Sequence, residues 1–288
     1  MMGDQMVTVY NLSTLYVVIK GYSSGAGTDR IYLTAMYPNT DIEYNAGSGW
    51  IPLGSTLNPG NMVSYDMGNI SGTPYAVTIR STQPVACLHS TSESIHPAAG
   101  IVPSLYSLGQ SDFSYYQMGD KNAVHNAAML VYRADCDTNF YISYTDNATN
   151  TLVSDQLIDP LNTNQTNPTL SAGFSLDYKG PVPGVTGWEY MRITLSNKAD
   201  SGLVKLSNTE SPFSFGYYSG CASNTNRLYH AYNTYGYLST FGSFSFDVDT
   251  IWRCASAKNP VTLMGGFAEY YKWILPDSTI KKAVLWFL

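Results

Sequence analysis

Residue types that carry out chemistry occur together at a few points of this sequence. "GYSSG" at 21–25 has the Gly-x-Ser-x-Gly pattern in which Ser23 would act as a nucleophile. That chemistry requires a strand, a tight turn and a helix, so that the serine stands exposed on the turn. Here a turn and a second strand, expected at 30–37, follow the serine. The motif therefore predicts a Gly/Ser turn without a nucleophile.

"DCDTN" at 135–139 places Asp135, Asp137 and Asn139 at alternate positions, as the oxygen ligands of calcium loops are placed. The glycine and the distant glutamate of such a loop are missing. Aspartate and asparagine also begin hairpins without any ion, because their side chains hydrogen-bond to the local backbone. The motif predicts a turn and no metal site.

Four histidines, His89, His96, His125 and His230, are the candidates for acid–base chemistry. No cysteine or carboxylate clusters beside them in the sequence, so we expect each to be a hydrogen-bonded or solvated side chain. Catalysis would require a nucleophile with its base, or a pair of carboxylates, and neither is visible. We therefore expect no catalytic residue, no bound metal and no cofactor.

The cysteines at 87, 136, 221 and 254 lie too far apart in the sequence for a zinc-type pair. An even number permits two disulfides, and the pairing to test first is Cys87–Cys136 with Cys221–Cys254.

Tyrosines gather within about twenty residues of the second half. A tyrosine offers a broad, stiff contact area and a hydroxyl group, which suits recognition of a protein or a glycan. The alternative is that alternate tyrosines cover a sheet. The predicted ligand-binding residues are Tyr217, Tyr218, Tyr229, Tyr232, Tyr235 and Tyr237.

The composition indicates the elements that must position these residues. The chain has 288 residues, of which 44% are hydrophobic and only 12% are charged, and it contains 24 tyrosines and 24 glycines. Aromatic residues suit strands and glycines suit turns, so we expect an all-β protein. The best helix candidate is a short turn around 97–105. With a net charge of −6 and no basic run, nucleic acid is an unsuitable partner. The longest apolar runs, 15–19 and 283–288, are too short for a helix that spans a bilayer.

A strand–proline–strand pattern occurs twice and indicates a duplicated β module. In "YAVTIRSTQPVACLHS" (75–90) alternation stops at Ser81-Thr82-Gln83-Pro84 and then resumes; "GLVKLSNTESPFSFGYYSG" (202–220) repeats the plan around Pro212. Because proline cannot donate a backbone hydrogen bond, each proline predicts a tight corner between two strands, the second of which crosses to, or pairs beside, the other sheet.

We therefore expect two tandem, related β-sandwich modules at 1–118 and 119–250. Near residue 250 the character changes, and Cys254, a strand, and Trp273 before a Pro-Asp turn look like the opening of an Ig-like domain. Such a domain needs about 100 residues. Residues 251–288 are therefore expected to be its truncated start, and the parent chain is expected to be longer, so a missing leader means little.

The ordered set of these segments resembles the N-terminal domain family of IgGFc-binding proteins. The similarity runs from about residue 5 to residue 250, and "CASNTNRLYHAYN" at 221–233 departs from the family pattern. In bacterial members of Bacteroidetes type, an Ig-like or PKD-like domain often follows, as 251–288 does here. The segments that carry the resemblance are 75–90, "AAGIVPSL" (98–105), "GWEYMRITL" (187–195), 204–220 and "YNTYGYLSTFG" (232–242).

The resemblance implies a non-enzymatic, extracellular or cell-surface adhesion module that binds a host or cell-surface protein or a glycan; it does not imply binding of IgG. Two alternatives remain open. The chain would be a structural spacer if its surface were smooth and polar, or a carbohydrate-active enzyme if two exposed carboxylates faced a cleft.

Overall fold

The protein is all-β, as its composition predicts. The computed structural model describes residues 12–21, 23–24, 29–68, 73–93, 96–107, 110–117, 123–136, 140–146, 151–158, 174–195, 202–209, 211–221, 233–237, 271–274 and 280–283. Within these ranges the helical structure is one 3₁₀ turn, η2 (Ala134–Cys136), and no helix is long and apolar enough to cross a membrane. The chain forms two compact units, 1–241 and 242–288.

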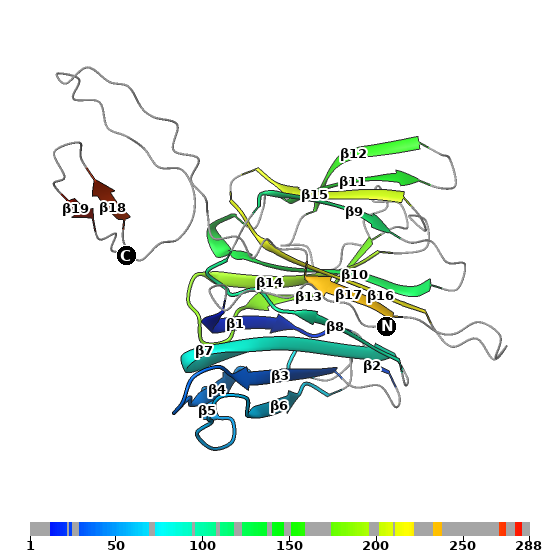
Figure 1. Cartoon of the computed structure of the whole chain (residues 1–288). Coiled ribbons are helices and arrows are strands. Elements are labelled where there is room, and N and C mark those ends of the chain that lie inside the picture. Colours follow the sequence, from blue (N-terminus) through cyan, green and yellow to red (C-terminus); the bar gives the residue numbers. More distant parts are fainter. Residues whose placement is uncertain are drawn as a thin grey trace, which may run out of the picture. The chain divides into compact units, whose positions relative to one another are not determined.

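The first part of the larger unit is a sheet organised around one long strand, β7 (Figure 1). Its first half pairs with β1 and β4, its second half with β3 and β8, and its last residues with β2. Buried residues from both halves share one core, to which β7 contributes Val77, Ile79, Val85 and Cys87. The strands are β1 (Ser13–Ile19), β2 (Ser23–Ser24), β3 (Asp29–Ala35), β4 (Ile42–Asn45), β5 (Trp50–Pro52), β6 (Met62–Asp66), β7 (Ala76–Glu93) and β8 (His96–Ile101).

The predicted corner at Pro84 is wrong, because β7 runs through it without a break. On one side of β7, pairing with β4 ends at Ser81 and pairing with β3 begins at Val85. On the other side, the register of β1 shifts at the same level through an irregularity. Pro84 therefore lies where no ladder partner requires its missing N–H, and the strand changes partners there. The expected helical turn around 97–105 is also wrong, since its first residues belong to β8.

The predicted corner at Pro212 is confirmed. β15 (Gly202–Asn208) ends before the proline and β16 (Ser214–Cys221) begins after it. β15 belongs to a four-stranded sheet and β16 to a five-stranded one, so the chain crosses from one sheet to the other at this proline.

These two sheets pack face to face, in the manner of a β-sandwich. The strand order is β13-β14-β10-β16-β17 in one sheet and β12-β11-β15-β9 in the other. Their shared core is rich in aromatic rings, among them Phe113, Phe140, Phe213 and Phe215. The other strands are β9 (Asp112–Gln117), β10 (Ala123–Arg133), β11 (Phe140–Asp146), β12 (Thr151–Ile158), β13 (Phe174–Pro181), β14 (Trp188–Leu195) and β17 (Asn233–Tyr237).

The outer face of the five-stranded sheet packs against the first sheet, so the larger unit has successive β layers (Figure 1). β10 lies between two cores, and its residues from Ala127 to Tyr132 are all buried. We call the residues at this junction the interlayer cluster. Its buried members are Val17, Ile19, Ala76, Leu105, Met129, Val131, Val182, Tyr190 and Tyr218.

The smaller unit contains one described hairpin, β18 (Tyr271–Ile274) with β19 (Ile280–Ala283). Trp273, the expected core tryptophan of an Ig-like domain, lies on β18 opposite Lys281. The module limits at 118 and 250 lie outside the described residues, and the Ig-like assignment of 251–288 stays a prediction.

Candidate functional site

The six tyrosines that were predicted to bind a ligand do not share one environment in the structure. Tyr218 is fully buried in the interlayer cluster, so its prediction as a ligand contact is wrong in this fold. Tyr217 is half-buried, and its ring lies 4.7 Å from the ring of Tyr115. Tyr235 and Tyr237 lie on β17, opposite Tyr218 and Gly216, and nothing is described of their side chains. The remaining two predicted contacts, Tyr229 and Tyr232, lie outside the described residues.

The predicted pairing of Cys87 with Cys136 is also wrong. Cys87 is a free, fully buried thiol in the core of the first sheet, whereas Cys136 ends the 3₁₀ turn that follows β10. Cys221 ends β16, Cys254 lies outside the described residues, and their pairing remains a prediction.

Burial also determines how Cys87 should react. Because the site is desolvated, the pKa of the Cys87 thiol lies well above its usual value, and the reactive thiolate does not form near neutral pH. We expect iodoacetamide at pH 8 to leave Cys87 unmodified in the folded protein and to alkylate it fully in 6 M guanidinium chloride. Peptide mass spectrometry with and without denaturant measures this, and alkylation of Cys87 in the native protein would contradict its placement.

The other motifs occupy ordinary structural positions. Ser23 lies on β2, which is followed by another strand, so the strand–turn–helix of a nucleophile elbow is not formed there. Asp135 is exposed and pairs with Arg133 at 3.2 Å, and its proposed partners Asp137 and Asn139 lie outside the described residues. His96 and His125 lie on β8 and β10, and His230 lies outside the described residues.

One polar cluster was missed by the sequence analysis. Asp29 begins β3 and is fully buried, and its Oδ1 lies 2.5 Å from Nε2 of the fully buried His89. Its Oδ2 accepts hydrogen bonds from the backbone N–H of Gly21 at 2.7 Å and from the Thr91 hydroxyl at 3.3 Å. The nearby Lys20 is also buried, and desolvation lowers the pKa of its ammonium group although Asp29 and Asp66 oppose that shift.

This cluster holds strands together rather than meeting a ligand, because its side chains have no exposed surface. Among the described residues, no group of three or more histidines, cysteines and carboxylates is arranged to hold a metal ion.

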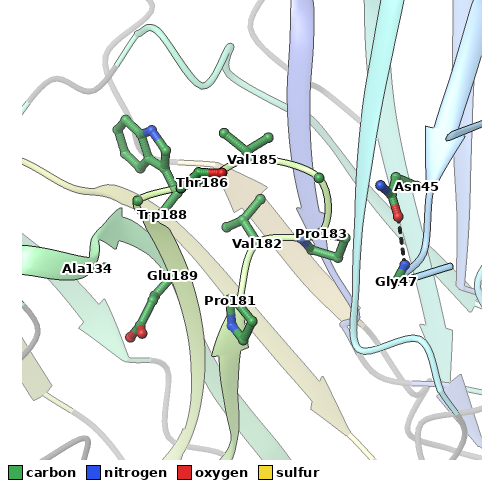
Figure 2. A pocket seen from close by; sticks show the side chains of 12 residues that line it. Asn45, Gly47, Ala134, Pro181, Val182, Pro183, Val185, Thr186, Trp188 and Glu189 are labelled. Carbon is green, nitrogen blue, oxygen red and sulfur yellow. Dashed lines mark hydrogen bonds between the residues drawn. The ribbon is translucent and has the colours of Figure 1, made fainter. Parts of the chain in front are cut away.

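A more accessible site lies at the turn between β13 and β14. This turn, residues 182–187, faces the turn that follows β4, and together they line a pocket of about 580 Å³ (Figure 2). The pocket falls within the range of about 300–1,000 Å³ that holds small-molecule ligands. Its lining includes Asn45, Val182, Val185, Thr186, Trp188 and Glu189.

Backbone hydrogen bonds fix the shape of the β13–β14 turn. Val182 donates to the carbonyl of Trp188 at 2.9 Å, and Val185 donates to the carbonyl of Val182 at 3.2 Å. The carbonyl of Gly187 accepts a bond from Ala134 at 3.0 Å. The turn is therefore built before any ligand arrives, which lowers the entropic cost of binding.

Gly184 allows the two turns to approach closely. Its φ of +72° lies in the left-handed region, and a Cβ atom there would come within 2.5 Å of Asn45 Nδ2 and about 3 Å of the Trp50 ring. Trp50 is held in turn by the guanidinium of Arg80, which lies 4.1 Å from its ring centroid. A side chain at 184 would separate the two walls of the pocket.

Asn45 supplies a polar group with an unmet hydrogen-bonding capacity. The residue is only 4% exposed, and its Oδ1 accepts a bond from the backbone N–H of Gly47 at 2.8 Å. That bond fixes the orientation of the amide, and Figure 2 shows Nδ2 on the side of the β13–β14 turn. In the part of the chain that the structure describes, Nδ2 donates to no acceptor.

Glu189 is the acidic residue of the pocket, and its charge is compensated. Its Oε2 lies 3.1 Å from Nζ of Lys179 and accepts a bond from the Tyr132 hydroxyl at 3.2 Å. The other carboxylate oxygen keeps its capacity to accept hydrogen bonds. Thr186 adds an exposed hydroxyl on the same turn.

Sequence comparison adds no assignment to this geometry, since neither the protein-family models nor the curated proteins contain a match to the chain.

Proposed function

We propose that the chain is a non-enzymatic recognition module of a longer extracellular or cell-surface protein, and that it binds a protein or glycan ligand at the β13–β14 pocket. The observation that carries this proposal is the buried Asn45 amide, which is fixed on one side and has free donors beside a rigid turn. A preformed pocket with a few polar groups of fixed orientation is typical of a binding site.

The location and the parent protein belong to the same proposal. The ordered segments at 75–90, 98–105, 187–195, 204–220 and 232–242 support membership of the IgGFc-binding N-terminal domain family. The Ig-like pattern of 251–288 supports a multidomain adhesion protein of Bacteroidetes type.

Binding is favoured over catalysis by the place of the acid–base groups. The histidine–carboxylate pair of the described residues, His89 with Asp29, has no exposed surface and cannot reach a substrate. Glu189 in the pocket is paired with Lys179 rather than with a second carboxylate, so the two-carboxylate arrangement of glycoside hydrolysis is not formed by the described lining.

A structural spacer is the second candidate, and the interlayer cluster is the observation that favours it. This apolar junction joins the β layers of residues 1–241, as a load-bearing segment of a long surface protein would require. A spacer would have no ligand of its own.

A blocking substitution separates these two functions. Thr186 is exposed, so Thr186→Arg should fill the pocket mouth without changing a core, and we expect at least a tenfold weaker response on an array of mucus proteins and glycans. Ser55→Arg, on another exposed turn, is the matched control and should bind like the unchanged chain. Equal binding by the Thr186→Arg and Ser55→Arg variants would show that the pocket is not the ligand-binding site. If the unchanged chain binds nothing on the array, the structural spacer is favoured.

A further inference from the structure

We infer that the ligand of the β13–β14 pocket is an uncharged sugar, recognised as a pyranose ring with free hydroxyl groups. This inference rests on the proposed function and names its ligand class.

Charge is the first restriction on the ligand. Glu189 is the charged residue of the pocket lining, and Lys179 lies 3.1 Å from its carboxylate. Among the described residues that line the pocket none is a lysine or an arginine, and the nearby ammonium group of Lys179 is already paired with Glu189, so a phosphate, a sulfate or an acidic sugar would find no unpaired counter-charge there. A cationic ligand would have to compete with Lys179 for the carboxylate. The lining therefore favours a ligand without net charge.

Hydrogen bonding is the second restriction. Asn45 Nδ2 presents donors only, whereas the unbonded oxygen of Glu189 presents acceptor sites only. The Thr186 hydroxyl both donates and accepts. A ligand whose groups both donate and accept can meet whichever of these sites it reaches, and the hydroxyl group does both. A ring with adjacent hydroxyls meets this requirement.

The apolar lining is the third restriction. Val182, Val185 and Trp188 line the same pocket, together with Pro181 and Pro183. A pyranose ring has an apolar face of C–H groups, which can pack against aliphatic and aromatic side chains while its hydroxyls point outward. A fully polar solute of the same size would make no apolar contact with these side chains.

A peptide fits the pocket less well. Extended peptides bind by adding to the free backbone groups of a strand edge. In the β13–β14 turn, the N–H groups of Val182 and Val185 and the carbonyls of Gly187 and Trp188 already have backbone partners. A proline-rich peptide would also lack N–H donors for the Glu189 carboxylate. The side-chain groups of the pocket, rather than its backbone, therefore select the ligand.

The test is ligand-observed saturation-transfer NMR on the full chain. The neutral probes are galactose, mannose, N-acetylglucosamine and lactose; the charged probes are glucuronic acid and N-acetylneuraminic acid, and a proline-rich decapeptide represents the peptide class. We expect at least one neutral sugar to bind, with saturation strongest at its ring C–H protons, and both charged sugars and the peptide to give no signal.

Asn45→Asp isolates the amide, because aspartate keeps the acceptor for the Gly47 N–H and removes both donors. We expect at least a tenfold loss of neutral-sugar affinity. The matched control is Asn61→Asp: Asn61 is exposed and its Oδ1 also accepts a backbone bond, from Asn58 at 3.2 Å. It should change affinity by less than twofold. If Asn45→Asp fails to give the thermal transition of the unchanged chain, Thr186→Arg takes its place.

The outcomes separate this inference from the proposed function. Binding of the peptide or of a charged sugar that depends on Asn45 would overturn the neutral-sugar inference and leave the recognition function standing. Neutral-sugar binding that survives both Asn45→Asp and Thr186→Arg would overturn the assignment to this pocket. If the chain binds none of the NMR probes and none of the proteins and glycans on the array, both the recognition function and the neutral-sugar inference are overturned.

Discussion

Replacing Asp29 by alanine should lower the free energy of unfolding by about 3–5 kcal/mol, because it removes the shared acceptor of several buried donors, at about 1–3 kcal/mol for each. His89 would lose the carboxylate that lies 2.5 Å from its ring, and the Gly21 N–H and the Thr91 hydroxyl would lose their acceptor. All three groups are at the buried end of the first core, where water cannot replace the lost partner. Chemical denaturation followed by tryptophan fluorescence measures the change.

The control for this substitution is Asp135→Ala. Asp135 is also paired with a basic residue, but its side chain is 68% exposed. Water and salt screen such a pair, so the expected loss is within about 0.5 kcal/mol. A loss of similar size in the two variants would show that the Asp29 cluster contributes no more than a surface pair.

Tyr218→Ala should lower the free energy of unfolding by about 3–5 kcal/mol, the usual cost of removing a fully buried aromatic ring. Tyr218 is among the largest fully buried side chains of the described residues and lies in the interlayer cluster, between the first sheet and the five-stranded sheet. Its removal leaves a cavity that the surrounding strands cannot close without losing their pairing. Differential scanning calorimetry should show a lower transition temperature, independent of any ligand.

Tyr106→Ala is the matched control, because Tyr106 is 54% exposed and contributes little packing. The transition temperature of the Tyr106→Ala variant should stay close to that of the unchanged chain. If Tyr218→Ala keeps full stability and loses only ligand binding, then Tyr218 is a contact residue and its placement in the interlayer cluster is wrong.

The sequence predicted elements well wherever local alternation determined them. In "DRIYLTA", which covers most of the strand expected at 30–37, every second residue is buried in β3. Alternation identifies a strand because one face of the sheet is in a core. It does not identify the partner of that strand.

The two prolines show this limit. Pro84 and Pro212 occur in similar local sequences, but the chain turns to another sheet only at Pro212. At Pro84 the neighbouring strands change instead, from β4 to β3, and β7 continues. Strand pairing over long sequence distances decides between these outcomes, and no local pattern records it.

The buried Asp29 cluster and the β13–β14 pocket could not be predicted either, because both depend on contacts between residues far apart in the sequence. His89 meets Asp29 across 60 residues because β3 and β7 pair in one particular register. Asn45 meets Gly184 because the first sheet packs on the five-stranded sheet. An isolated asparagine in "NAGSG" reads as a turn residue, which it also is, since it bonds to Gly47. Only its burial, which the sequence does not show, distinguishes it from other turn asparagines.

The length of β7 has a consequence for the order of events on the ribosome. β1, β3 and β4 precede β7 in the chain, and each forms backbone pairs with it. Until residues 76–93 leave the exit tunnel, these earlier strands have an unsatisfied edge, a state that promotes association between nascent chains. A nascent chain of which only the residues before 76 have emerged should therefore require chaperone protection. One that has emerged as far as residue 107, with β7 and β8 outside the tunnel, should resist protease at β1 and β3.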